Sequence, residues 1–448
     1  MRKTIHNQLS FVEPKIENEH AEEFSQIQKI IEANPEIAAC IHQDLIAGLK
    51  NPETGREGAL SGEQVFKIIL VKQIHGFSYR SLEFHLKDSR TYSAFCGFGL
   101  GDKVPSFKTI QRDIKKIRPE SFEAINQTLL VFAAKQGIEK GRTIRTDCTV
   151  VESNIHKPSD SSLLLDSVRV LSRVTKRAQE LFGLPAFSRY RVAKKRFKTI
   201  LNSKNKAERV GPYKDLLKVT QELHDNATNI AKTLQKQHAN NIDAIALVKE
   251  LNKFLPLVAQ VIFQTHARVI EDKKLPAGEK IFSIFEPHTD IIIKDRRDTG
   301  YGHKIALSSG KSGLFLDLVI ESGNPADSKL AVEMVERQHE IYGRYPRQTA
   351  MDGGFASKEN LKKIKELGVK DVAFAKKRGL EVVDMAKSSW VYKTLRNFRA
   401  GIEGMISFLK RCFGMRRCNW SGFQSFKAYS WASLISANLT LLARRMMT

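Results

Sequence analysis

A strand, a helix and a second strand follow one another between residues 347 and 375. Residues 347–352 predict a short strand that ends on Asp352, residues 358–367 a helix, and residues 369–375 an apolar strand. Two strands joined through a helix lie parallel in one sheet. Open α/β sheets place their sites at the carboxyl ends of such strands. The unit therefore predicts an α/β fold with Asp352 at the functional edge of a sheet.

An earlier strand carries a second acid. Residues 142–151 are rich in β-branched side chains and alternate in character, as a strand does. Asp147 stands in the middle of this run, where aspartate is unfavourable on propensity alone. A role as a metal ligand would explain an aspartate at this position.

Helical and extended segments separate these two strands. Residues 160–277 predict a helical insertion that contains a strongly basic loop at 189–198. Beyond it, the pattern predicts an antiparallel meander and a helix: strands at 280–285, 290–294, 303–308 and 314–321, and a helix at 326–342. A mixed sheet flanked by helices is the expected result.

The segment 396–410 predicts an amphipathic helix that presents one carboxylate among cations. At 100° per residue, Arg399, Glu403 and Lys410 fall within about 40° of one another, and Arg396 lies beside them. Arg399 and Glu403 can form an ordinary ion pair on a solvated surface, which would contribute only tenths of a kcal/mol. The same stripe can instead supply an acid and several cations to a site.

The first 137 residues are expected to form an all-helical domain. Within it, residues 60–118 contain short helices, a glycine-rich turn and a final basic helix over 107–118, an order that fits a helix-turn-helix module. The final helix would then meet DNA, and the alternative is a plain helical bundle with a charged surface. The cations that would contact DNA are Lys108, Arg112, Lys115 and Lys116.

The net charge favours a polyanionic partner. Lysine and arginine number 73 against 49 aspartates and glutamates, which gives +24. Nucleic acid is the natural candidate, because contacts to many phosphates release counterions. No apolar run of 18 residues occurs, so no membrane span is expected. Five scattered cysteines without a C-x-x-C pair predict reduced thiols in a cytoplasmic protein rather than a zinc site.

Two aspartates and a glutamate on separate rigid elements would form a hard oxygen site. Asp147, Asp352 and Glu403 suit Mg²⁺ or Mn²⁺. Two such ions about 4 Å apart would activate the attacking oxygen and stabilise the leaving oxygen at phosphorus. The surrounding cations would then hold a phosphodiester backbone.

These acids make the chain resemble the DDE transposases of bacterial insertion sequences, whose catalytic domain has an RNase H-like fold. Three motifs carry the resemblance: Asp147-Cys-Thr-Val-Val-Glu-Ser-Asn-Ile-His156, Met351-Asp-Gly-Gly-Phe355 and Arg399-x₃-Glu403-x₆-Lys410. The third matches the signature Tyr-x₂-Arg-x₃-Glu-x₆-Lys of the DDE_Tnp_1-like groups, except that Arg396 replaces the tyrosine. Among subgroups the pattern is most similar to the ISNCY-like elements.

The resemblance implies how the chain is divided and which residues act. An N-terminal helical domain (1–137) would precede an RNase H-like catalytic domain (138–159 and 278–448), interrupted by the helical insertion (160–277). The metal ligands would be Asp147, Asp352 and Glu403, and Arg399 and Lys410 would contact DNA phosphates or order the active site. An accessory or structural role is implied for three further residues of the first motif: Glu152, Asn154 and His156.

The implied function is transposition by a nucleoid-associated bacterial protein. It would bind the double-stranded ends of its element, hydrolyse phosphodiester bonds with two divalent metals and join the 3′-OH ends to target DNA, as a homodimer on paired ends. Two alternatives stay open. One is a metal-dependent nuclease without strand transfer, and the other is a non-catalytic DNA-binding regulator derived from a transposase.

Overall fold

The chain divides into two compact units. The computed structural model describes Thr4 and residues 19–49, 51, 58–99, 101–294, 298–376 and 378–447. One unit comprises residues 1–152 and 304–448, and the other comprises residues 153–303. Across the described residues, no helix combines the length and apolarity that a membrane crossing needs.

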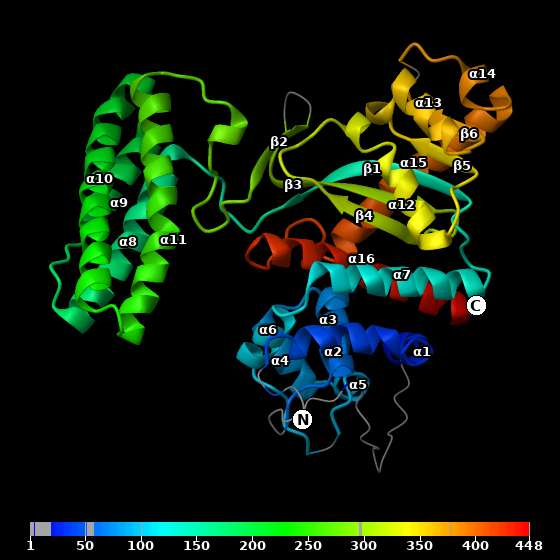
Figure 1. Cartoon of the computed structure of the whole chain (residues 1–448), viewed down its shortest axis with the longest axis horizontal. Coiled ribbons are helices and arrows are strands. Elements are labelled where there is room, and N and C mark those ends of the chain that lie inside the picture. The colour runs from blue at the N-terminus through cyan, green and yellow to red at the C-terminus, as the bar shows by residue number, and fades with distance from the viewer. Residues whose placement is uncertain are drawn as a thin grey trace. The chain divides into compact units, whose positions relative to one another are not determined.

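A mixed six-stranded sheet has five of its strands wholly or mostly in the first unit (Figure 1). Its order is β2-β3-β1-β5-β6, with β4 paired to β3. The parallel part consists of β1 (Thr143–Glu152), β5 (Gln348–Met351) and β6 (Asp371–Phe374). The antiparallel part consists of β2 (Asp290–Lys294), β3 (Asp298–Gly310) and β4 (Phe315–Ile320). The predicted α/β class is confirmed, and the order is that of an RNase H-like fold.

Two long helices cover one face of this sheet. Helices α7 (Pro119–Lys135) and α16 (Phe423–Met447) pack against each other and against β4. Asn438 of α16 binds both the N–H and the carbonyl of Phe315, and Asn126 of α7 donates to the carbonyl of Leu316. Side-chain amides thereby pair with strand backbone, which covers polar groups of β4 that water would otherwise have to satisfy.

Four further helices pack on the strands of this sheet. They are α12 (Glu333–Tyr342), α13 (Lys358–Glu366), α14 (Val382–Met385) and α15 (Ser389–Cys412). An apolar cluster of alanine, valine, leucine and phenylalanine side chains lies between these helices and the strands. Ser357 and Ser388 cap α13 and α15 by accepting a backbone N–H, so both helices begin where the sequence places a serine.

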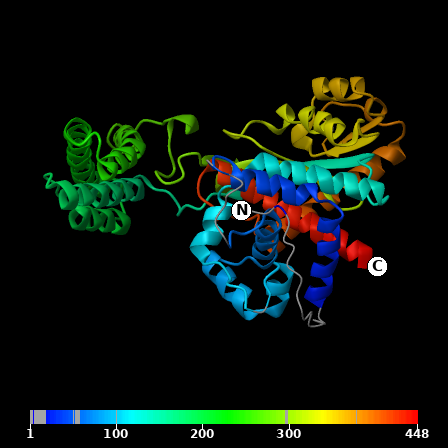
Figure 2. The ribbon, with the colours of Figure 1, turned by 60° about the horizontal axis from the view of Figure 1, so that its bottom comes forward.

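The N-terminal helices pack on α16 from the side away from the sheet (Figures 1 and 2). Ser61 and Gln64 form a reciprocal capping box at the start of α3, and Gly76 ends that helix in the left-handed conformation. The helices of this part are α1 (Glu19–Glu32), α2 (Glu36–Ile46), α3 (Gly62–His75), α4 (Tyr79–Asp88), α5 (Arg90–Phe95) and α6 (Phe107–Ile114).

The second unit is built mainly from four helices with their own apolar core. These are α8 (Asp160–Phe182), α9 (Tyr190–Asn202), α10 (Lys206–Gln237) and α11 (Ile242–Thr265), and a π-helical turn, η2 (His266–Ile270), continues α11. The prediction of a basic loop at 189–198 is wrong, because most of this segment forms α9. Ala193 and Ile200 lie seven residues apart, on the same side of α9, and both are buried. The many charged residues of this segment made its apolar side hard to recognise in the sequence.

Other local expectations also need correction. The strand expected at 280–285 does not form, because the amide of Gln264 bonds both backbone groups of Ile281 and Ser283 accepts from the N–H groups of Phe285 and Glu286. The helix expected over 326–342 is a short 3₁₀ turn, η4 (Asp327–Lys329), followed by α12. The basic helix expected over 107–118 ends at Ile114.

Candidate active site

The parallel pairing of β1 and β5 brings two acids side by side. The register joins Arg145 to Ala350 and Thr146 to Met351, so the next residues on the two strands are Asp147 and Asp352. Asp147 accepts the N–H of Cys148 through Oδ1, and Asp352 caps the turn that follows β5. Both carboxylates are therefore held at the same position along the sheet.

Helix α15 adds a third acid and an arginine between them. It packs on β1, β5 and β6. Nη2 of Arg399 lies 2.8 Å from Oδ2 of Asp147 and 2.9 Å from Oδ1 of Asp352, and Nη1 lies 3.1 Å from Oε1 of Glu403. One guanidinium thus connects three carboxylates that come from three elements of the chain.

The three acids differ in exposure, and their combined negative charge exceeds the positive charge of Arg399. The side chain of Asp147 is 14% exposed, that of Asp352 36% and that of Glu403 68%. Three carboxylates against one guanidinium leave a local charge of −2. Burial raises the pKa of Asp147, while the guanidinium of Arg399 and the Cys148 N–H oppose this and the neighbouring Asp352 adds to it. The cluster has an excess of negative charge that a cation could neutralise.

Arg145 anchors α15 to the strand that carries Asp147, a role that the sequence analysis missed. Its Nε donates to Ser309, and its Nη1 donates to the carbonyl of Phe398 at 2.7 Å. The guanidinium also lies 4.6 Å from the centre of the Phe398 ring. At Gly401, any Cβ would collide with Nη1 of Arg145. An arginine within a predicted strand, two residues before an acid, is the sequence signal that could have indicated this role. In the structure this arginine is only 9% exposed.

The donor set of this cluster fits a hard divalent cation. Among the described residues, no three His, Cys, Asp or Glu side chains stand close enough together to hold a metal ion as they are. The three acids instead share the guanidinium of Arg399, which supplies positive charge between them. Carboxylate oxygens are the ligands that Mg²⁺ and Mn²⁺ prefer, so the residues present are of the right chemical type.

Comparison with known families identifies the chain's relatives. The family described as "Transposase DDE domain" matches residues 292–439. The family described as "Transposase domain (DUF772)" matches residues 12–116. The chain belongs to the DDE transposases of insertion sequences. No curated protein and no solved structure matches this transposase.

The matched ranges divide the candidate residues of the transposase. Asp352, Arg399, Glu403 and Lys410 lie inside the DDE match, whereas Asp147 lies before it. Most of the helical unit lies outside both matches. Transposases of this family generally use divalent metal ions and act on DNA.

Two further cations of the transposase lie on α15. Lys410 is in its last turn, seven residues beyond Glu403, and a rise of about 1.5 Å per residue puts the two Cα atoms roughly 10 Å apart along the axis. Arg396, which replaces the signature tyrosine, lies with its guanidinium 6.0 Å from the ring centre of Tyr392, one turn earlier. The hydroxyl of Tyr392 donates to the carbonyl of Phe374. Arg396 therefore borders the cluster rather than entering it.

The cations predicted for DNA recognition lie on and after α6. Lys108 and Arg112 are exposed and one turn apart on this helix, and Nε of Arg112 lies 3.4 Å from Asp113. Lys115 and Lys116 follow the end of the helix, in the turn that leads to α7. All four side chains are at least partly accessible, so their role in DNA recognition stays a prediction.

The remaining residues of the first motif have separate surroundings. Glu152 exchanges backbone hydrogen bonds with the segment 416–418. Asn154 is exposed, and Nε2 of His156 lies 3.6 Å from the carboxylate of Asp166. These contacts are compatible with the accessory or structural role implied for them.

Proposed function

We propose that this transposase cleaves phosphodiester bonds at the ends of its element and transfers the freed 3′-hydroxyl to target DNA. The observation that carries the proposal is the convergence of Asp147, Asp352 and Glu403 on Arg399. The fold does not require these three acids to meet, because Asp352 and Glu403 are substantially exposed.

In this proposal the three acids hold one or two Mg²⁺ or Mn²⁺ ions. Bound there, the ions would supply activation of the attacking oxygen and stabilisation of the leaving oxygen in an in-line displacement at phosphorus. The chain's own residues prepare the site. The strand register fixes Asp147 and Asp352, and Arg145 fixes the helix that carries Glu403.

Arg399 has two successive roles in this proposal. Without a cation it reduces repulsion among the three carboxylates. Once positive charge is supplied from elsewhere, its guanidinium is released to bind a DNA phosphate, for which its planar donors are well suited. Lys410 would contact the backbone further along the same helix, and Lys108, Arg112, Lys115 and Lys116 would bind the element ends.

Cleavage and joining of an end-bearing DNA substrate in Mg²⁺ would test the proposal. Asp147→Ala, Asp352→Ala and Glu403→Ala should each abolish nicking and joining while binding of the ends persists. Glu366→Gln, at an exposed acid on α13, is the matched control and should act as the wild type does. Full cleavage by the Asp352→Ala variant would disprove the assignment.

The products also separate the alternatives. Nicked DNA without joined products would favour a nuclease that lacks strand transfer. Binding of DNA without any Mg²⁺-dependent product would favour a regulator. Deletion of residues 60–118 should remove sequence-specific binding, and unchanged binding would show that end recognition lies elsewhere.

A further inference from the structure

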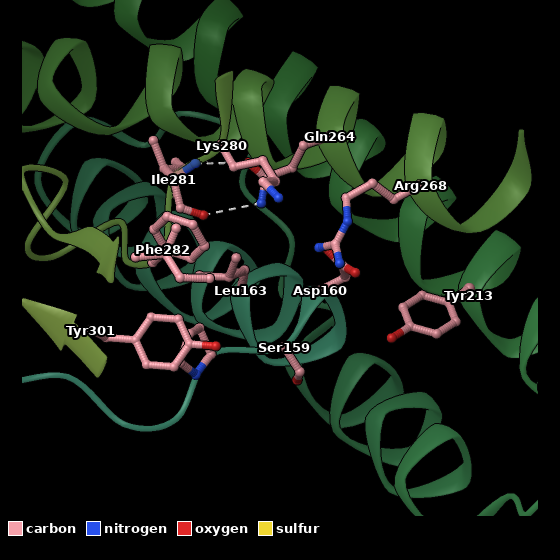
Figure 3. Close-up of a pocket in the computed structure, with 12 residues that line it drawn as sticks. Ser159, Asp160, Leu163, Tyr213, Gln264, Arg268, Lys280, Ile281, Phe282 and Tyr301 are labelled. Atoms are coloured by element: carbon pink, nitrogen blue, oxygen red, sulfur yellow. Dashed lines mark hydrogen bonds and ion pairs between the residues drawn. The ribbon is translucent and has the colours of Figure 1, made fainter. Parts of the chain in front are cut away.

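The helical unit contains a cavity that the proposed transposition chemistry does not use. Its volume is about 310 Å³, and it opens between the start of α8, the π-helical turn η2 and the segment around residues 280–282 (Figure 3). Small-molecule sites measure roughly 300–1,000 Å³. The cavity is thus large enough for one small ligand and too small for a DNA duplex.

Charged groups line one side of this cavity. Nη1 of Arg268 lies 2.8 Å from Oδ1 of Asp160, whose side chain is only 12% exposed. Burial raises the pKa of Asp160, and the positive charges of Arg268 and Lys280 oppose that increase. Two cations face one carboxylate, so the cavity wall has a net positive charge that suits an anion such as phosphate.

Aromatic rings line the other side. Phe282 and Tyr301 have ring centres 5.5 Å apart with their planes tilted by 51°, and both side chains are partly accessible. Figure 3 shows them together, across the cavity from Arg268 and Asp160. Exposed aromatic faces bind nucleobases by stacking regardless of base identity. An aromatic wall opposite a cationic wall matches the two ends of a nucleotide.

The backbone around the cavity is held in an unusual conformation. Arg268 lies on η2 (His266–Ile270), and π-helical turns are rare and often occur at functional sites. Gln264, one turn earlier and fully buried, bonds both backbone groups of Ile281 and so fixes the segment that carries Lys280 and Phe282. Both walls are therefore fixed relative to each other before any ligand binds, which lowers the entropic cost of binding.

We propose that this cavity binds a single nucleotide unit, with the base stacked on Tyr301 and the phosphate between Arg268 and Lys280. The nucleotide can come from a free nucleoside phosphate or from an unpaired position of a DNA strand. Residues 153–303 contain 27 lysines and arginines against 16 aspartates and glutamates, so the unit can hold a strand that passes the cavity. The DNA source rests on the proposed function, whereas the free-nucleotide source does not.

The test uses 2-aminopurine, whose fluorescence falls when it stacks on an aromatic ring. The full chain is titrated, without divalent metal, against three probes: free 2-aminopurine nucleoside monophosphate, the same base in a single-stranded overhang, and the same base paired inside a duplex. Quenching of the overhang but not of the duplex identifies an unpaired nucleotide of DNA as the ligand. Quenching by the free probe identifies a free nucleotide.

Variants assign the binding to this cavity. Tyr301→Ala should weaken binding about tenfold or more, while Tyr301→Phe, which keeps the ring, should bind as the wild type does. Lys280→Ala should weaken binding severalfold, and Lys274→Ala, at an exposed lysine outside the cavity, should not. Thermal unfolding of each variant confirms that it is folded.

The outcomes separate this inference from the proposed function. Asp352→Asn should bind all probes normally, because Asp352 lies in the other unit. If folded Tyr301→Ala and Lys280→Ala variants quench the probes as the wild type does, or if the paired base is quenched as strongly as the overhang, the nucleotide site is disproved. Loss of cleavage in Asp352→Asn with intact quenching would leave both proposals standing.

Discussion

Two arginines of the same compact unit gather carboxylates in opposite ways. Arg337 holds Asp317 through two nitrogens, Nε at 2.5 Å and Nη2 at 2.8 Å, and holds Glu123 through Nη2 at 2.5 Å. Arg399 instead makes one contact with each of three acids. The Asp317 side chain is 2% exposed, whereas the side chain of Glu403 is 68% exposed.

The difference separates an acid cluster that holds the fold from one that is open to a ligand. Asp317 also accepts the N–H of Leu318, so its oxygens are occupied, and its hydrogen bonds to Arg337 raise the pKa of that guanidinium. Around Arg399, single contacts leave oxygens of three acids accessible, with an excess of negative charge. Four sets of substitutions test this distinction.

The largest effect is expected at Asp352. Asp352→Asn should lower Mg²⁺-dependent cleavage on the order of 10³-fold or more, because the loss of one residue of a catalytic unit costs about as much activity as the loss of all of them. Its stability should change little, since the side chain is 36% exposed and stands beside another carboxylate. Rates per folded molecule and urea unfolding measure the two quantities. A large loss of stability with retained cleavage would assign this cluster to the fold instead.

The next effect concerns stability at the other arginine. Arg337→Met should lower the free energy of unfolding by about 3 kcal/mol, because Asp317 is then left buried without its partner. Arg399→Met should cost less than about 1 kcal/mol, since Asp352 and Glu403 are substantially exposed and water can solvate them once the guanidinium is removed. Urea unfolding of both variants gives the comparison. Equal losses would contradict the distinction between the clusters.

A smaller effect is expected from the anchor of α15. Arg145→Met removes the bonds to Ser309 and Phe398 and should lower cleavage roughly 10–100-fold, as the loss of a residue that orients a metal-binding side chain does. End binding should persist, and Arg142→Met, an exposed neighbour, serves as the control. Gly401→Ala should act in the same direction through its collision with Arg145. Wild-type cleavage in Arg145→Met would show that α15 is positioned without it.

The smallest effect is expected at Arg396. This side chain is exposed and borders the cluster, so Arg396→Tyr, which restores the signature residue, should change stability by no more than about 0.5 kcal/mol. Cleavage should change by less than about threefold. A large gain in cleavage would show that the cluster extends to this position and that the tyrosine has a direct role.

Local patterns in the sequence predicted the elements that carry the candidate site. The alternation of residues 142–151 indicated β1, and the short β-α-β unit indicated that β5 and β6 are parallel, as the structure confirms. Periodicity predicted α15 with Arg399 and Glu403 on one stripe, because the geometry of a helix depends only on nearby residues. The fold class followed from these elements, and the family was indicated by the resemblance of the three motifs that carry Asp147, Asp352 and Glu403.

Predictions failed where a distant side chain replaced the expected backbone partner. Residues 280–285 have the composition of a strand, yet Gln264 of α11 takes the backbone bonds of Ile281. The basic run at 189–198 looked like a solvated loop because its one buried residue, Ala193, is outnumbered by its charges. Neither outcome can be predicted from a short stretch of sequence, since each depends on what packs against the segment.

The spacing of nearby residues was enough to predict which acids belong to strands and which cations share the helix of Glu403. Tertiary packing was needed to show that Asp147, Asp352 and Glu403 meet at Arg399, and that Arg145 holds α15 in place. The contacts of Arg399 with Asp147 and of Arg145 with Phe398 each join residues more than 200 positions apart. Strand register and helix docking set them, and both are properties of the whole packed unit.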